Sequence, residues 1–89
     1  MITVYVLRSL RDQSLYIGVT ERDVMERLRE HNLGRTLGNR NRIPFELVYQ
    51  ETYDSLELAV RRERFLKSGK GRRILTQLIA NRQSGNESL

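Results

Sequence analysis

The sequence predicts a small α/β protein of the α+β type, with its elements in the order β-β-α-β-α-α. Three short runs alternate apolar and polar residues with the period of a strand, and three longer runs repeat apolar residues with the period of a helix. The chain has 89 residues and no internal repeat, so it suits one domain with a modest core. We assign that domain to residues 1–80 and a polar tail to residues 81–89.

The first two runs predict a β-hairpin with a polar turn. Residues 2–8 and 14–20 each alternate with period 2, and the pleat puts their aliphatic side chains on one face: Ile2, Val4, Val6, Leu15, Ile17 and Val19. Tyr5 and Tyr16 share the other face, almost opposite each other. They either form a cross-strand aromatic pair, worth about 0.2–1 kcal/mol, or meet a ligand. Gly18 marks either a bulge or the close approach of another group.

Residues 20–34 predict the first helix, with an N-cap signal at its start and a glycine at its end. Its apolar stripe consists of Val24, Met25 and Leu28. At about 100° per residue, Arg27 and His31 fall beside this stripe and near the sheet. Glu26 and Glu30 point the other way. The alternative roles are a solvated helix residue for Arg27 and, for His31, a cation that favours the C-terminal end of the helix.

The next part of the chain predicts a basic loop, a third strand and two more helices. Residues 34–44 hold two glycines, three arginines and the single proline, as in a loop. Residues 45–53 predict the strand, in which Phe45, Leu47 and Tyr49 alternate against Glu46, Val48 and Gln50. Residues 56–68 and 69–80 predict the helices, the first of them capped by the Asp-Ser pair that precedes it.

Glu63 falls in the middle of one arc of the second predicted helix. Within about 60° of one another on a helical wheel, this arc holds Leu56, Ala59, Val60 and Lys67. A carboxylate there lies beside apolar surface, which suits a functional acid. Alternatively, Leu58 and Phe65 mark the buried side of the helix, and Glu63 is a solvated residue that pairs with Lys67 for a few tenths of a kcal/mol.

The charge of the chain favours a nucleic-acid partner. Sixteen Lys and Arg residues against eleven Asp and Glu residues give a net charge of +5. The excess is concentrated in the stretches "GRTLGNRNR" and "RRERFLKSGKGRR", and such patches suit phosphate backbones, although ordinary solubilising charge is the alternative. The candidate phosphate contacts are Arg35, Arg40, Arg42, Arg72 and Arg73.

Composition also excludes several classes of site. The chain has no Cys and one His, which excludes disulfides, iron–sulfur clusters, thiolate zinc sites and multi-histidine metal sites. Any metal must therefore be a hard cation bound by oxygen. No apolar run approaches the roughly 20 residues of a membrane helix, and the first residues lack an export signal. We expect the protein in the cytoplasm.

Several short motifs, taken in their order, resemble those of the GIY-YIG nuclease family, in particular its small stand-alone bacterial members. They are Tyr5 in "VYV", "YIG" at Tyr16 to Gly18, Arg27 in "ERLREHN", and Glu63 in the helix after the third strand. The resemblance covers about residues 2–80. It implies a three-stranded antiparallel sheet flanked by helices, and cleavage of phosphodiester bonds in DNA, as in DNA repair. The matching positions are Tyr5, Tyr16, Gly18, Arg27, His31 and Glu63, with Lys67 as an auxiliary residue.

The resemblance further implies one divalent cation, Mg²⁺ or Mn²⁺, held by Glu63. A tyrosine there acts as general base or orients the attacking water, and Arg27 steadies the phosphate. The residue chemistry agrees, because Mg²⁺ keeps most of its waters and takes few protein ligands. Tyr, with a reference pKa near 10, is a poor base unless cationic neighbours stabilise the phenolate. The residues alone leave the base open between Tyr5 and Tyr16, whereas the resemblance favours Tyr5.

The sequence departs from the family pattern at two places, and the second of them supports a rival interpretation. The first signature is "VYV" without the family glycine, and the Asn that many members carry about three helical turns beyond the Glu would fall near Leu75. A nucleic-acid-binding module that keeps the scaffold without turnover is therefore the main alternative. A third possibility is a protein-interaction domain whose basic surface meets an acidic partner.

Overall fold

The computed structural model describes the backbone of residues 1–36 and 38–87 and the side chains of those residues through Arg82. Its elements are β1 (Ile2–Ser9), β2 (Leu15–Thr20), α1 (Val24–Asn32), the short 3-10 helix η1 (Arg40–Arg42), β3 (Phe45–Tyr53), α2 (Leu56–Lys67) and α3 (Gly69–Glu87). The predicted order β-β-α-β-α-α is confirmed. None of the helices in this part of the chain has the length and apolar character needed to cross a membrane.

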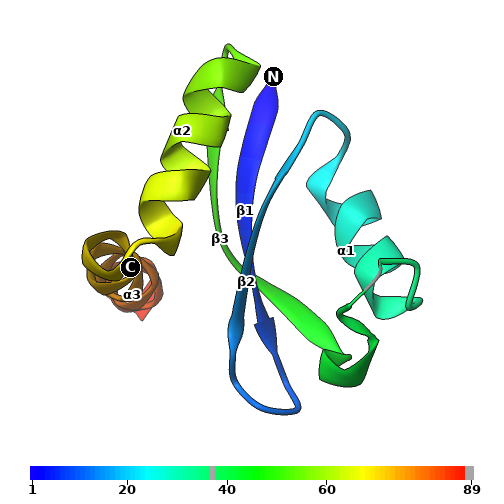
Figure 1. Cartoon of the computed structure of the whole chain (residues 1–89). Helices are drawn as coiled ribbons and strands as arrows, with labels where there is room; N and C mark the ends of the chain where they lie inside the picture. Colours follow the sequence, from blue (N-terminus) through cyan, green and yellow to red (C-terminus); the bar gives the residue numbers. More distant parts are fainter. Residues whose placement is uncertain (37, 88–89) are drawn as a thin grey trace.

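The strands form one antiparallel sheet in the order β2-β1-β3, so β1 is central and β2 is an edge strand. Figure 1 shows α1 on one side of the sheet and α2 and α3 on the other. The predicted three-stranded sheet flanked by helices is therefore confirmed. Both faces of β1 are covered, which explains why four consecutive residues of this strand, 4–7, are buried.

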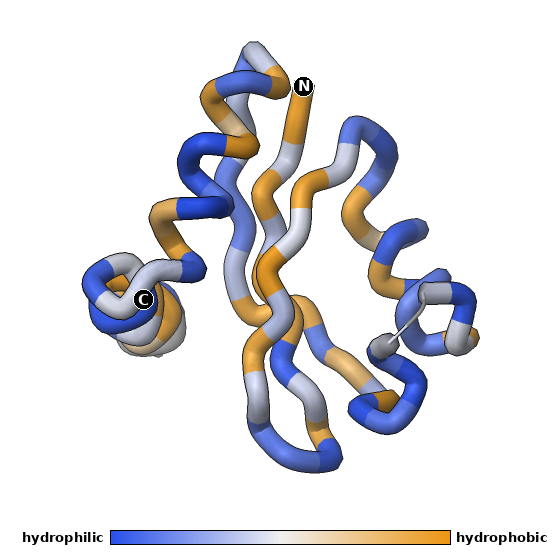
Figure 2. Tube along the Cα trace, viewed as in Figure 1, coloured by the Kyte–Doolittle hydropathy of each residue, from blue (hydrophilic) through white to orange (hydrophobic). Residues whose placement is uncertain are grey.

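The core beneath α2 and α3 uses the aliphatic face predicted for the hairpin. Its buried members are Val4, Val6, Ile17, Ala59, Leu66, Leu75 and Ile79, with Ile2, Leu15 and Val19 packed against them. Figure 2 shows hydrophobic (orange) segments along the strands and on the helices beside them. Each fully buried aliphatic side chain contributes about 1.5–3 kcal/mol. This layer fixes α2 on the sheet.

The second core lies between the sheet and α1. Tyr5, Leu7 and Phe45 are buried there, and Val24 and Leu28 of α1 pack against them. Met25 was predicted in the same stripe, but its side chain is 54% exposed, because it lies about 100° away from Val24 around the helix. The helix also begins later than predicted, at Val24, where the Asp23 carboxylate accepts a hydrogen bond from the Met25 N–H.

A register shift between Val6 and Leu7 changes the pattern of β3. Leu7 pairs with Leu47 and Val6 pairs with Tyr49, which leaves Val48 as the extra residue of a bulge. Phe45 and Leu47 accordingly contact the core under α1, whereas Tyr49 packs in the core under α2 and α3. The predicted alternation of all three on one face is wrong beyond Leu47.

The third helix is longer than predicted. It was expected to end at residue 80, but it continues to Glu87. Residues 81–87 contain no proline, and adding a turn to an existing helix costs far less than starting one. The last two residues of the predicted polar tail, 88–89, lie outside the described part of the chain.

Candidate active site

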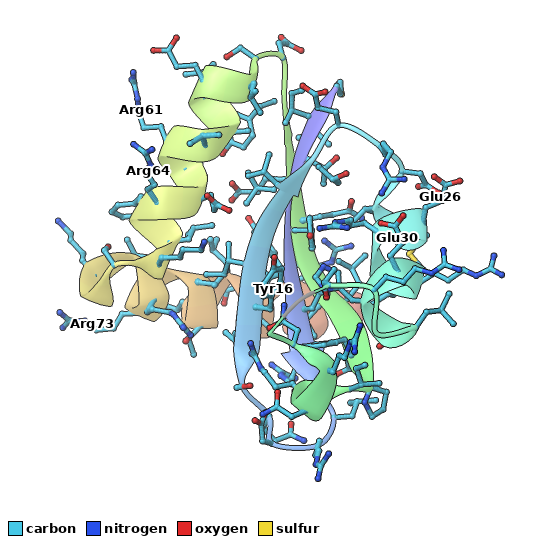
Figure 3. All side chains as sticks on the ribbon, turned by 45° about the vertical axis from the view of Figure 1, so that its right-hand side comes forward. Tyr16, Glu26, Glu30, Arg61, Arg64 and Arg73 are labelled. Atoms are coloured by element: carbon cyan, nitrogen blue, oxygen red, sulfur yellow. The ribbon has the colours of Figure 1, made fainter. Side chains whose placement is uncertain are left out.

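Four of the predicted site residues lie together between the sheet and α1. Tyr5 and Tyr16 come from β1 and β2, and Arg27 and His31 come from α1. The Tyr5 and Tyr16 ring centroids are 6.2 Å apart, and the His31 centroid lies 5.9 Å from that of Tyr5 and 4.7 Å from that of Tyr16. We call these four residues the tyrosine cluster. In Figure 3 its Tyr16 lies on β2 at the front of the sheet.

The two tyrosines share a face as predicted, but they are diagonal neighbours. Tyr5 pairs with Gly18, and Leu7 pairs with Tyr16. A Cβ atom at Gly18 would lie 2.6 Å from both Cζ and the hydroxyl oxygen of Tyr5. The missing side chain therefore lets the Tyr5 ring lie across edge strand β2. No register shift interrupts the β1–β2 pairing, so of the two roles considered for Gly18, close approach holds and the bulge does not.

His31 connects Tyr5 to the loop after α1. Its Nε2 lies 3.0 Å from the Tyr5 hydroxyl, and its Nδ1 lies 3.0 Å from Oγ1 of Thr36. Burial, with a smaller effect from the charge of Arg27, lowers the pKa of His31 below its usual 6.5. The ring is therefore neutral at neutral pH, which does not fit the alternative role of a helix-terminal cation.

The hydroxyl of Tyr5 is a weak acid in this setting. Burial, reinforced by the neighbouring Tyr16, raises its pKa to about 12, and the guanidinium of Arg27 opposes this shift through hydrogen bonding and charge. The side chain is 1% exposed. Tyr5 thus becomes a base only if its proton moves to a neighbouring acceptor, and His31 Nε2 lies within hydrogen-bond distance.

Arg27 is held in place by an acid that was predicted to point elsewhere. Its Nη1 donates to Oε1 of Glu30 at 2.9 Å, and Nη2 of Arg22 donates to the same oxygen at 2.5 Å. The two arginines lower the pKa of the Glu30 carboxyl to about 2. Glu30, visible on α1 in Figure 3, therefore stays ionised and holds Arg27 on the flank of α1 nearest Tyr5.

Glu63 lies on α2, across the sheet from the tyrosine cluster. Its side chain is 19% exposed, and Oε2 lies 3.4 Å from Nζ of Lys67. The ion pair considered from the sequence thus exists, but the carboxylate is mostly covered. Within the described ranges, no hydrogen bond or ion pair joins Glu63 to the cluster. Glu63 and Lys67 are therefore paired with each other on α2, and the other four catalytic candidates are grouped on the α1 side of the sheet.

The flank of α2 that carries Glu63 nevertheless faces edge strand β2, the strand that carries Tyr16 of the cluster. Arg62 marks the flank turned toward β3, because its guanidinium binds Glu51 through two hydrogen bonds of 3.0 and 3.1 Å. With 3.6 residues per turn, Glu63 and Lys67 fall on the opposite flank, on the side of β2. The Tyr5 hydroxyl lies over Gly18 of that strand. Both groups thus approach edge strand β2, one from each face.

The possible metal ligands suit a cation that takes most of its ligands from water. No group of three or more His, Cys, Asp or Glu side chains that could hold a metal ion lies among residues 1–36 and 38–82. A single covered carboxylate such as Glu63 fits Mg²⁺ or Mn²⁺, because these hard ions accept one or two carboxylates and complete their shells with water and phosphate oxygens.

The five arginines predicted to bind nucleic acid do not form one surface. Arg35 and Arg40 are exposed beside the C-terminal end of α1, whereas Arg72 and Arg73 are exposed on α3. Figure 3 shows Arg73 with Arg61 and Arg64, far from Tyr16 and Glu30.

Arg42 has an internal role. It donates to Oγ of Ser14, to the Leu15 carbonyl and to Asn39, and its guanidinium lies 5.5 Å from the centre of the Phe45 ring. Arg42 therefore ties the basic loop to the hairpin and has few donors left for a phosphate.

Sequence reasoning missed two polar networks. Thr36 and Glu30 complete the tyrosine cluster, and neither stands out in the sequence because their partners depend on how α1 docks. A second network lies under α2, where Glu51 accepts hydrogen bonds of 2.6 Å from both Tyr49 and Tyr53 and binds Arg62. This network joins β3 to α2.

Comparison with known proteins agrees with this arrangement. Residues 1–75 match the family model described as the GIY-YIG catalytic domain. The chain is 38% identical over 81 residues to the UPF0213 protein SpyM3_1077 of Streptococcus pyogenes serotype M3, covering 90% of this chain and 86% of that protein. It is 44% identical over 66 residues to the UPF0213 protein NP_0776A of Natronomonas pharaonis, covering 73% and 75% of the two chains.

A solved structure shows the same fold. The solution NMR structure of the UPF0213 protein BH0048 from Bacillus halodurans is 35% identical, covers 88% of this chain and 85% of its own, and superposes with a TM-score of 0.52. The family match includes the tyrosines, the α1 arginine and the α2 glutamate in one continuous region. The chain therefore belongs to the GIY-YIG family of nuclease domains.

Proposed function

We propose that the protein is a divalent-metal-dependent endonuclease that hydrolyses phosphodiester bonds in DNA. The observation that carries this proposal is the buried hydrogen bond between Tyr5 and the neutral ring of His31, beside Arg27. A nuclease needs a base for the attacking water and positive charge for the phosphate. The tyrosine cluster supplies a phenol with a proton acceptor and an oriented guanidinium side by side.

The proton steps follow from that geometry. The Tyr5 O–H bond breaks as its proton moves to Nε2 of His31, which leaves a phenolate beside Arg27 and an imidazolium. The phenolate then takes a proton from a water molecule as the water oxygen attacks phosphorus. In this proposal Tyr5 is the base, and Tyr16, which is less buried, orients the water or the phosphate. Arg27 offsets the charge that develops on the phosphate oxygens.

Glu63 is the proposed ligand of the cation, with Lys67 as its neighbour. When bound, Mg²⁺ or Mn²⁺ would polarise a phosphate oxygen and stabilise the departing oxygen. The support is that Glu63 is a covered carboxylate on the β2 flank of α2. The exposed acid Glu57 on the same helix offers a matched comparison, because it pairs with Arg61 on the surface and its side chain is 81% exposed.

Binding is proposed to use phosphate contacts on the side of α1. Arg35 and Arg40 lie next to the loop that reaches His31, so a DNA backbone held by them would pass close to the tyrosine cluster. A pocket of about 330 Å³ along α1 includes Arg35 in its lining. It is lined by Arg22, Glu26, Arg29, Glu30, Leu33 and Arg35. Contacts of this kind position DNA without reading its sequence.

A second candidate function is nucleic-acid binding without turnover. Two observations favour it: within the described part of the chain no hydrogen bond or ion pair joins Glu63 to the cluster, and Leu75 is fully buried in the core near the place where many family members carry an Asn. On this interpretation the scaffold and the basic surface are kept, and hydrolysis is lost.

The test is a nuclease assay on plasmid, nicked, branched and single-stranded DNA, with and without Mn²⁺. We expect cleavage by the wild type that needs the ion, no cleavage by Glu63→Ala with DNA binding retained, and normal cleavage by the control Glu57→Ala. Full activity of Glu63→Ala would contradict the assigned metal ligand. Binding of DNA by the wild type with no cleavage of any substrate would support the second candidate.

A further inference from the structure

We propose that Thr36 is a positioning residue that sets the tautomer of His31, so that the ring accepts the proton of Tyr5. The catalytic consequence rests on the proposed nuclease function, whereas the tautomer itself does not. Thr36 lies in the basic loop, outside every motif that identifies the family.

The first support is that both ring nitrogens of His31 have one partner each. The side chain is fully buried, with 0% exposure. Nε2 lies 3.0 Å from the Tyr5 hydroxyl, and Nδ1 lies 3.0 Å from Oγ1 of Thr36. A neutral imidazole has one donor and one acceptor nitrogen, so the choice of tautomer is decided by these two hydroxyls.

The second support is the difference between the two hydroxyls. A phenol, with a reference pKa near 10, is a stronger hydrogen-bond donor and a weaker acceptor than an aliphatic alcohol. The better arrangement therefore has Tyr5 donating to Nε2 and the Nδ1–H donating to the Thr36 oxygen. In this tautomer Nε2 carries the lone pair that takes the Tyr5 proton. The opposite tautomer would present an N–H to Tyr5, and Nε2 would then have no lone pair to take the Tyr5 proton.

The third support is how the chain delivers Thr36. After α1, Gly34 adopts a left-handed conformation with φ of +76°, and its N–H donates to the His31 carbonyl at 3.1 Å. The Arg35 N–H donates to the Glu30 carbonyl at 3.0 Å. These bonds turn the chain back along the end of the helix, as in a helix C-cap with glycine. Thr36 thereby comes to lie against a ring five residues earlier.

Thr36 also matters after the proton has moved. Once His31 is an imidazolium, both of its nitrogens are donors, and a buried donor without an acceptor is costly. The Thr36 oxygen accepts from Nδ1–H in the neutral and in the charged ring. Removing that oxygen disfavours both the required tautomer and the protonated intermediate, while the contacts that bind DNA stay intact.

The experiment uses the full chain and exploits its single histidine, which makes the ring signals unambiguous. Long-range ¹H–¹⁵N NMR on the wild type is expected to show the neutral Nδ1–H tautomer. Thr36→Val removes the hydroxyl at nearly constant volume, and we expect loss of that tautomer and a fall in kcat of about tenfold, with KM for DNA unchanged. Thr36→Ser keeps the hydroxyl and is expected to restore both tautomer and kcat.

Each outcome decides the inference. A wild-type ring in the Nε2–H tautomer would overturn it without any variant, and so would a Thr36→Val protein that keeps both the tautomer and its kcat. A melting curve for Thr36→Val checks that the variant folds. If the wild type proves to cleave no DNA, the proposed function fails, whereas the NMR measurement still decides whether Thr36 sets the tautomer.

Discussion

At the scale of single residues, the proposed chemistry requires Tyr5 and His31 to act together. Tyr5 alone, with a pKa of about 12, would hold its proton at neutral pH, and a buried neutral His31 alone would have no role in hydrolysis. Their hydrogen bond joins a weak acid to an acceptor inside a covered site. The positive charge of Arg27 stabilises the Tyr5 phenolate, because a negative oxygen in a site with little water is unfavourable without a neighbouring cation.

The Glu30 carboxylate is expected to act through Arg27. In Glu30→Gln the charge that binds Arg22 and Arg27 is lost, so the guanidinium of Arg27 is less well oriented toward the phosphate. We expect kcat to fall about tenfold, as for a small misplacement of a catalytic group. Steady-state cleavage kinetics measure this.

The matched control for that variant is Glu26→Gln. Glu26 is an exposed acid on the same helix, and no hydrogen bond or ion pair ties its side chain to another within the described part of the chain. Equal losses in the two variants would mean that the overall charge of α1 matters, and would contradict a specific role for Glu30.

At the scale of elements, the site depends on what lies on each face of edge strand β2. Edge strand β2 carries Gly18 under the Tyr5 ring, and α2 presents Glu63 on the flank beside that strand. The bulge in β3 lets Phe45 pack under α1 while Tyr49 turns toward α2, so both faces of the sheet remain filled. The sheet thus has the tyrosine cluster on the face covered by α1 and the main hydrophobic core on the face covered by α2 and α3.

Gly18→Ala is expected to disturb both stability and the site. A Cβ atom would lie 2.6 Å from the Tyr5 ring and 3.0 Å from Cε1 of Tyr16, so the tyrosines must move. Overpacking of this kind costs about 1–3 kcal/mol, which urea unfolding measures. Gly69→Ala is the control, because a Cβ there meets nothing within 4 Å. Unchanged stability and cleavage in Gly18→Ala would refute the close approach of Tyr5.

At the scale of the whole molecule, the positive charge divides between two sides. Arg35 and Arg40 lie after the end of α1, in the loop whose Thr36 contacts His31, and Arg72 and Arg73 lie on α3, which covers the other face of the sheet. The chain measures about 33 × 30 × 28 Å, so a duplex that enters the site along α1 would leave the α3 side free.

The salt dependence of DNA binding tests this division. Each lost phosphate contact lowers the slope of log K against log salt by about 0.9. We expect Arg35→Ala with Arg40→Ala to lower the slope by about 1.8, and Arg72→Ala with Arg73→Ala to leave it unchanged. The reverse result would place the DNA on α3, away from the tyrosine cluster.

The sequence by itself determined the elements, the hairpin face that forms the main core, and the residue types of the site. Period-2 and helical patterns depend on neighbours along the chain, so they are readable without coordinates. Predictions from the sequence are wrong chiefly where a longer-range contact overrides the local pattern. The β3 bulge depends on pairing with β1, and the exposure of Met25 depends on how α1 docks. The length of α3 is a separate, local error, because a helix propagates past a polar stretch at little cost.

Only the tertiary structure decided which polar groups act together. His31 lies between Tyr5 and Thr36, and Arg27 pairs with Glu30. Arg42 forms hydrogen bonds within the fold, and Glu63 lies on α2, on the other face of the sheet. These pairings join different elements, and hydrogen bonds form only within about 3 Å and a narrow range of angles. A sequence fixes which donors and acceptors exist, whereas the docking of α1 and α2 on the sheet fixes which of them come within that range.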